Sequence, residues 1–138
     1  PAIERLIAEL ADLDKCRRCP PKLQSEAYAV RSGLEGIIAE HFDSWGMKKG
    51  EDGRRSFRSA REAARVDPKN LAAWNTYGKA LVTIAGKPFK GRIASYLEID
   101  LGKEIGLAAT RLRALLPASS APPADVAATL RALEALLD

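Results

Sequence analysis

The sequence predicts an all-α fold in which amphipathic helices pack as antiparallel hairpins, forming a short solenoid or a helical bundle. Three observations predict it. Apolar residues recur every three or four positions in each long segment of the 138-residue chain, which is the spacing of one helix face. Short runs rich in proline, glycine or polar residues separate these segments. Aromatic residues make up only 6% of the chain, and the abundance of alanine and leucine favours helices packed on helices.

The first two helices are expected at about residues 2–14 and 22–46. They are separated by the run CRRCPP at 16–21, since two adjacent prolines cannot lie inside a helix. Gly33 and Gly36 are weak points of the second helix, because glycine lowers helix stability. The apolar face of this helix consists of Leu23, Ala27, Val30, Leu34, Ile37, His41 and Trp45. A polar, glycine-rich loop is expected from 46 to 53.

The clearest pattern in the chain covers residues 56–81 and predicts a hairpin of two helices. Pro68 disfavours helix at Asp67, and Asn70 is a good N-cap, so one helix ends and the next begins within about four residues. Such a short connection predicts an antiparallel pair. Small residues, Gly78 among them, allow close approach of the backbones, and Trp74 is expected to be buried between the helices.

This hairpin resembles a tetratricopeptide (TPR-like) helical repeat, with the second helix of one repeat followed by the first helix of the next. The resemblance covers about one repeat unit, at residues 56–81. It rests on Ala60, Ala63, Asp67, Pro68, Trp74, Tyr77, Gly78 and Leu81, in family-like order. It implies a TPR-like domain over residues 1–116 and a role in protein–protein interaction rather than in catalysis.

The C-terminal part predicts one long helix, a linker and a final helix. The long helix is expected from about 93 to 116, and Gly102 and Gly106 inside it are expected to mark a close helix contact or a bend. A linker rich in proline, serine and alanine covers 117–123. The last helix, within residues 124–138, would cap the domain. The linker would also let it exchange onto a second copy, which leaves a homo-oligomer as an alternative.

Positive charge is concentrated just before and within the first helix of the hairpin. Seven basic and three acidic residues lie between Lys48 and Arg65, an excess that equals the net charge of the whole chain, +4. Four of the basic residues are spaced four, three and four apart, which places them on one side of a helix. We call Arg54, Arg58, Arg61 and Arg65 the arginine stripe. It is either a solvated face or a binding surface for an acidic peptide, a phosphate group or nucleic acid.

The leading hypothesis is a non-enzymatic adaptor or scaffold domain that binds a peptide or protein partner. By the resemblance, the first helix of each pair lines the binding groove. We expect Asn75 and Lys79, four residues apart on one helix face, to bind there together with Lys87 and Tyr77. The sequence contains no HExxH metal motif and no phosphate-binding glycine loop, so no catalytic residue is assigned. A nucleic-acid-associated protein that uses the arginine stripe is the second hypothesis.

Two cysteines and the single histidine leave room for a third hypothesis, a metal- or redox-responsive domain. Cys16 and Cys19 form a CxxC motif beside basic residues, which would lower a thiol pKa. A structural zinc site needs four ligands, and His41 supplies only a third, so no metal and no cofactor are expected. Structural cysteines or a local disulfide remain the plainer interpretation. A cytoplasmic location is favoured, and a periplasmic one stays open if a signal peptide was removed before Pro1.

Overall fold

The computed structural model describes residues 5–6, 8–9, 18–41, 51–116 and 123–137, with the backbone alone for 34–41 and 51–53. The described residues are helical, with connecting turns and no strand, so the predicted all-α class is confirmed. Of the first expected helix only residues 5, 6, 8 and 9 are described, and these are helical. The other helices are α2 (Pro21–His41), α3 (Glu51–Val66), α4 (Leu71–Ala85), α5 (Lys90–Leu97), α6 (Leu101–Leu115) and α7 (Ala124–Leu137).

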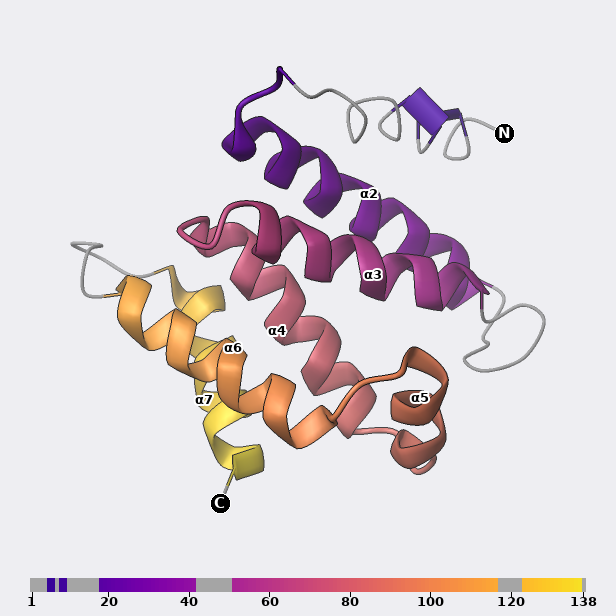
Figure 1. The fold of residues 1–138 in the computed structure, drawn as a ribbon. Coiled ribbons are helices and arrows are strands. Elements are labelled where there is room, and N and C mark those ends of the chain that lie inside the picture. The colour runs from indigo at the N-terminus through magenta and orange to yellow at the C-terminus, as the bar shows by residue number, and fades with distance from the viewer. Residues whose placement is uncertain (1–4, 7, 10–17, 42–50, 117–122, 138) are drawn as a thin grey trace.

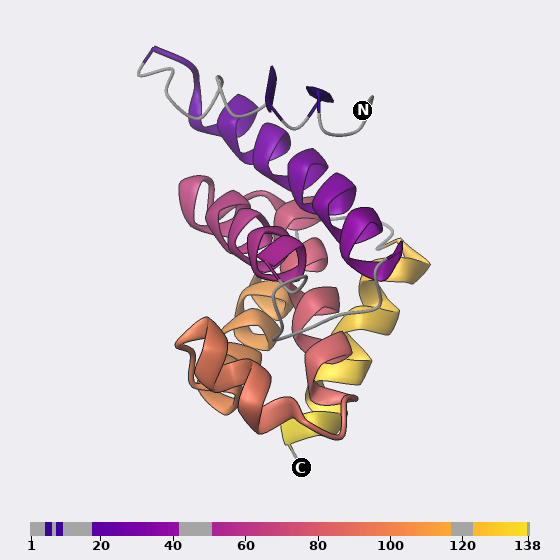
Figure 2. The ribbon, with the colours of Figure 1, turned by 90° about the vertical axis from the view of Figure 1, so that its right-hand side faces the viewer.

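Helix α4 is the centre of this arrangement. It contacts α2, α3, α5, α6 and α7. Helices α2 and α3 lie side by side and antiparallel on one side of α4, and α6 and α7 lie on the other (Figures 1 and 2). The sequence of α4 explains this position, because Lys79 is its only charged residue. A helix with so few charges can be buried on several sides.

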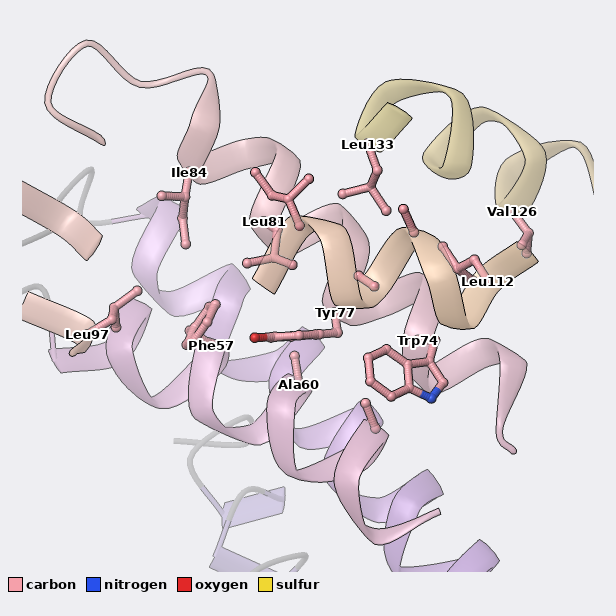
Figure 3. Packing of buried hydrophobic residues seen from close by; sticks show 14 of the residues in the cluster. Phe57, Ala60, Trp74, Tyr77, Leu81, Ile84, Leu97, Leu112, Val126 and Leu133 are labelled. Carbon is pink, nitrogen blue, oxygen red and sulfur yellow. The ribbon is translucent and has the colours of Figure 1, made fainter. Parts of the chain in front are cut away.

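The core gathers around three aromatic side chains from α3 and α4 (Figure 3). Tyr77 lies between Phe57 and Trp74, with ring centroids 5.5 and 6.0 Å away, and the Trp74 ring meets it edge-on. Trp74 is only 5% exposed, so its predicted burial is confirmed. Leucine and isoleucine side chains from α4, α5, α6 and α7 complete the cluster; Leu81, Ile93, Leu112 and Leu133 are among them.

Local capping produces the predicted turn between α3 and α4. The side chain of Asn70 accepts a hydrogen bond from the backbone N–H of Ala73 at 3.2 Å, as expected of an N-cap. The indole N–H of Trp74 donates to the Pro68 carbonyl at 2.9 Å, which fixes the ring against the turn. The Asn70 amide also donates to Ser25, whose hydroxyl donates to the Ala63 carbonyl, so the turn and α3 are both tied to α2.

The prediction of a single helix over 93–116 is wrong, because this part of the chain forms two helices, α5 and α6. Glu98 takes the left-handed conformation, with φ of 58°. The backbone N–H of Glu98 donates to Ser95 and that of Ile99 to Ala94, at 3.1 and 3.0 Å, which is the hydrogen-bond pattern of a Schellman helix end. Asp100 then caps α6 by accepting from the N–H of Lys103 at 3.2 Å.

The glycine predictions also need correction. A Cβ atom added at Gly106 would meet nothing within 4 Å, and one at Gly102 would meet only an Asp100 oxygen at 3.8 Å. Neither glycine therefore allows a close helix contact. Gly78 does, but on the side of α7 and α6: an added Cβ would lie 2.9 Å from Thr129 and 3.1 Å from Leu133. The glycine of the central hairpin thus brings α7 close to α4.

The other helix boundaries lie near their predicted positions. Helix α4 ends at Ala85, before the predicted Gly-Lys-Pro turn, and α7 covers the predicted last helix. Helix α2 is described as far as His41, so its predicted end near 46 lies outside the described residues, and α3 already begins at Glu51, inside the predicted loop. The rest of the predicted loop at 46–53, Trp45 and nearly all of the predicted linker lie outside the described residues.

Candidate functional site

The basic surface of α3 is the candidate functional site. Phe57, Ala60 and Ala64 bury one side of α3 in the core, so its charged residues are confined to the remaining surface. The arginine stripe lies on that surface, but its members have different surroundings. The guanidinium carbon of Arg54 lies 5.1 Å from the ring centroid of Tyr96 on α5, whereas Arg58 is exposed.

The last two arginines of the stripe form ion pairs of very different kinds. Arg61 meets Glu104 of α6 at 2.9 Å, and the Glu104 side chain is only 10% exposed. Arg65 meets Glu62 on its own helix at 3.7 Å, with both side chains largely in solvent. Exposed pairs of this kind contribute little to stability and exchange readily with water. Arg61 is therefore a structural residue, whereas Arg65 keeps its charge accessible.

A first cavity of about 280 Å³ lies on the surface between α2 and α3. We call it the α2–α3 cavity. Its lining brings three arginines, two hydroxyl groups and one carboxylate together, so cations outnumber anions. The residues are Tyr28, Arg31, Arg55, Arg58, Ser59 and Glu62. The sequence pattern did not indicate Arg31, since it lies on another helix from the arginine stripe and joins it only through the antiparallel packing of α2 on α3.

A second cavity of about 230 Å³ lies between α3, α4 and α6. We call it the α3–α4–α6 cavity. Two aromatic residues and an alanine provide apolar lining, and charged side chains surround them. The residues are Arg61, Ala64, Arg65, Trp74, Tyr77, Lys103, Glu104 and Leu107. Leu107 is 44% exposed, so apolar surface continues from the cavity to the outside.

Beside the Arg61–Glu104 pair lies the buried hydroxyl of Tyr77. Among the described residues this hydroxyl has no hydrogen-bond partner, although Tyr77 is only 1% exposed. Burial, then the negative charge of the nearby Glu104 carboxylate and its capacity to accept a hydrogen bond from the hydroxyl, raise the pKa of Tyr77 well above its ordinary value of 10.0, although the two groups do not meet hydrogen-bond geometry. The tyrosine therefore stays neutral at any physiological pH, and it packs rather than titrates.

The predicted groove residues of α4 are occupied by contacts inside the chain. Tyr77 belongs to the core and is only 1% exposed; it borders the α3–α4–α6 cavity rather than a groove on the surface of α4. Asn75 is 8% exposed and donates to Asp125 of α7 at 3.0 Å, and Lys79 pairs with the same carboxylate. Hydrogen bonds from Lys79, and then from Asn75, lower the pKa of Asp125 below its ordinary value of 3.8. Helix α7 thus covers much of the surface that the sequence pattern placed in a groove.

Lys79 keeps one exposed side. It borders a shallow cavity of about 340 Å³ between α4 and α7, whose other lining residues are Val82, Thr83, Ala128, Thr129 and Ala132. Lys87 lies beyond the end of α4 in the turn that leads to α5. The helix rises roughly 9 Å over the six positions from Lys79 to Ala85, and Lys87 follows in the turn and does not line the cavity that Lys79 borders.

Most of the side chains on which the cysteine and histidine hypotheses depend lie outside the described part of the chain. Cys19 takes part in a disulfide, while Cys16 lies outside the described residues. His41 is the last residue of α2, and only its backbone is described. No group of three or more histidine, cysteine, aspartate or glutamate residues in the described part of the chain is placed to hold a metal ion.

Comparison with known proteins adds no family to this description. No family model, no curated protein and no solved structure matches the chain. The tetratricopeptide resemblance therefore stays a prediction that rests on one hairpin. None of the helices among the described residues is long and apolar enough to cross a membrane.

Proposed function

We propose that this chain is a non-enzymatic adaptor or scaffold domain that binds an acidic peptide or protein through the basic surface of α3. The single observation that carries the proposal is the pair of cavities along α3, each with more cationic than anionic side chains in its lining. Arginine forms paired, charge-assisted hydrogen bonds with carboxylates, so a carboxylate-rich partner suits this surface.

The α2–α3 cavity supports this proposal most directly. Arg55 and Arg58 are exposed on α3, and Arg31 reaches the same cavity from α2. Arginines held on two packed helices present their charges in a fixed arrangement, which favours one partner geometry over another. Charges of this kind mainly raise the rate of association.

A nucleic-acid partner is the second candidate. Tyr28 lines the α2–α3 cavity among the three arginines, which provides one aromatic ring beside a phosphate-binding charge cluster. Counterion release makes the affinity for nucleic acid fall steeply with salt. Binding of a 20-nucleotide single strand and of a duplex, measured at about 50 and 200 mM salt, separates this candidate from the first.

Capture of partners from an extract of the native host tests the adaptor proposal. The full chain is compared with an Arg55→Glu/Arg58→Glu variant, and the captured proteins are identified by mass spectrometry. The matched control is Arg111→Glu/Arg131→Glu, which changes the net charge equally at exposed positions of α6 and α7. We expect the first variant to lose the wild-type partner and the control to retain it. Equal capture by both variants would contradict a role for the α3 surface.

A further inference from the structure

We propose that the α3–α4–α6 cavity receives one large apolar side chain of an acidic peptide, and that Arg65 and Lys103 bind carboxylates on either side of it. The proposal rests on the proposed function and names the site and the chemistry of the partner. The site is formed by three helices, and its occupant combines one apolar anchor with neighbouring negative charges.

The size and lining of the cavity determine the anchor. A volume of about 230 Å³ lies below the roughly 300–1,000 Å³ of sites that enclose a whole small molecule. Such a cavity suits one side chain of the leucine or phenylalanine class. The Trp74 and Tyr77 rings and Ala64 offer apolar contacts, and Leu107 extends them to the rim. Because the Trp74 N–H already donates to the Pro68 carbonyl, this ring requires no hydrogen-bond acceptor on a ligand.

The charges around the cavity determine what flanks the anchor. Glu104 is engaged by Arg61, and this pair is mostly withdrawn from solvent. Arg65 and Lys103 are exposed, and the Glu62 carboxylate that pairs with Arg65 lies 3.7 Å away in a largely exposed pair. A carboxylate of the partner can replace that weak contact at little cost. Two accessible cations beside an apolar cavity therefore match an apolar residue set between acidic ones.

The test uses a defined peptide, acetyl-Glu-Glu-Leu-Asp-Glu-amide, titrated into the ¹⁵N-labelled full chain and followed by NMR. The indole N–H signal of Trp74 reports on the cavity, and a Trp45→Phe variant assigns it, since the chain has two tryptophans. A second peptide carries serine in place of leucine, and a third carries glutamine and asparagine in place of the acids. We expect the Trp74 signal to shift with the first peptide and both replacements to weaken binding, the serine one by roughly tenfold or more.

Charge reversals on the protein separate this site from the general charge of the chain. Arg65→Glu and Lys103→Glu are expected to weaken binding of the first peptide several-fold, whereas Arg111→Glu, at an exposed position of α6 outside both cavities, leaves it unchanged. If Arg111→Glu is as harmful as Arg65→Glu and the serine peptide binds equally well, the inference is overturned while the proposed function stands. If the first peptide does not bind, the inference is also overturned, and partner capture decides the proposed function independently.

Discussion

Replacing Tyr77 by phenylalanine removes one oxygen atom from the centre of the core. The ring keeps its contacts with Phe57 and Trp74, so no cavity of side-chain size forms. The hydroxyl has no hydrogen-bond partner among the described residues. An unsatisfied buried polar group costs about 1–3 kcal/mol, and its removal recovers part of this cost. We therefore expect Tyr77→Phe to raise the free energy of unfolding by up to about 2 kcal/mol, or to leave it unchanged.

Urea unfolding followed by circular dichroism measures this change, and Ser25→Ala is the matched control. Ser25 is fully buried like Tyr77, but its hydroxyl donates to the Ala63 carbonyl and accepts from Asn70. Its loss should lower the free energy of unfolding by about 1–3 kcal/mol, because Asn70 and the carbonyl each lose a partner. A loss above about 1 kcal/mol in Tyr77→Phe would show that the Tyr77 hydroxyl is satisfied in solution, with the Glu104 carboxylate as its acceptor.

The raised pKa of Tyr77 adds an alkaline test of the same residue. Burial keeps the proton on the folded chain, whereas the unfolded chain releases it near pH 10.0. The stabilising contribution is therefore complete below this pH and is lost as the pH rises above it. Wild type should lose more stability than Tyr77→Phe between about pH 8 and 11. Parallel loss in both proteins would show that Tyr77 is hydrated in the folded state.

Three further predictions concern the helix contacts and helix ends, each measured by urea or thermal unfolding. Gly78→Ala should destabilise the protein by about 1–3 kcal/mol, because the added Cβ would lie 2.9 Å from Thr129. Gly106→Ala should stabilise it by about 0.5–1 kcal/mol, because the added Cβ would meet nothing within 4 Å and alanine favours a helix over glycine. The same sign in both variants would contradict the close approach of α7 to α4. Glu98→Gly should stabilise by about 0.5–1 kcal/mol by relieving the left-handed backbone, and destabilisation would imply that α5 and α6 are continuous in solution. Asp125→Asn should make the free energy of unfolding depend less on acidic pH. The lowered pKa of Asp125 stabilises the folded chain above pH 3.8, and this contribution is lost as the pH falls below that value. The same pH dependence in wild type and variant would show that the Asp125 carboxylate does not hold α7 against α4.

Local signals explain which parts of the fold could be predicted. Pro68 and Asn70 stop one helix and cap the next within a few residues, so the hairpin was visible in the sequence. The break between α5 and α6 was not, because Ile93 and Leu97 continue the apolar spacing into α6. The left-handed position holds Glu98 instead of the usual glycine, which hid the helix end. Asp100 as an N-cap was the remaining signal.

The candidate site was predictable only in part, because spacing shows which residues share a helix face but not what packs against that face. Asn75 and Lys79 do share a face of α4, yet α7 returns to that face from fifty residues later. Arg31 joins Arg55 and Arg58 only through the pairing of α2 with α3. Such long-range contacts decide exposure, and periodicity carries no information about them.

The division of the arginine stripe decides how its function can be tested. Reversing Arg61 would place two carboxylates together, because Glu104 lies 2.9 Å from the guanidinium and is largely buried. Removing one partner of a buried pair destabilises a protein by up to about 3–5 kcal/mol, and the partial exposure of Arg61 lowers that figure. A loss of binding in such a variant would then report unfolding as readily as lost attraction. Arg58 and Arg65 carry exposed charge, so their reversal separates recognition from stability.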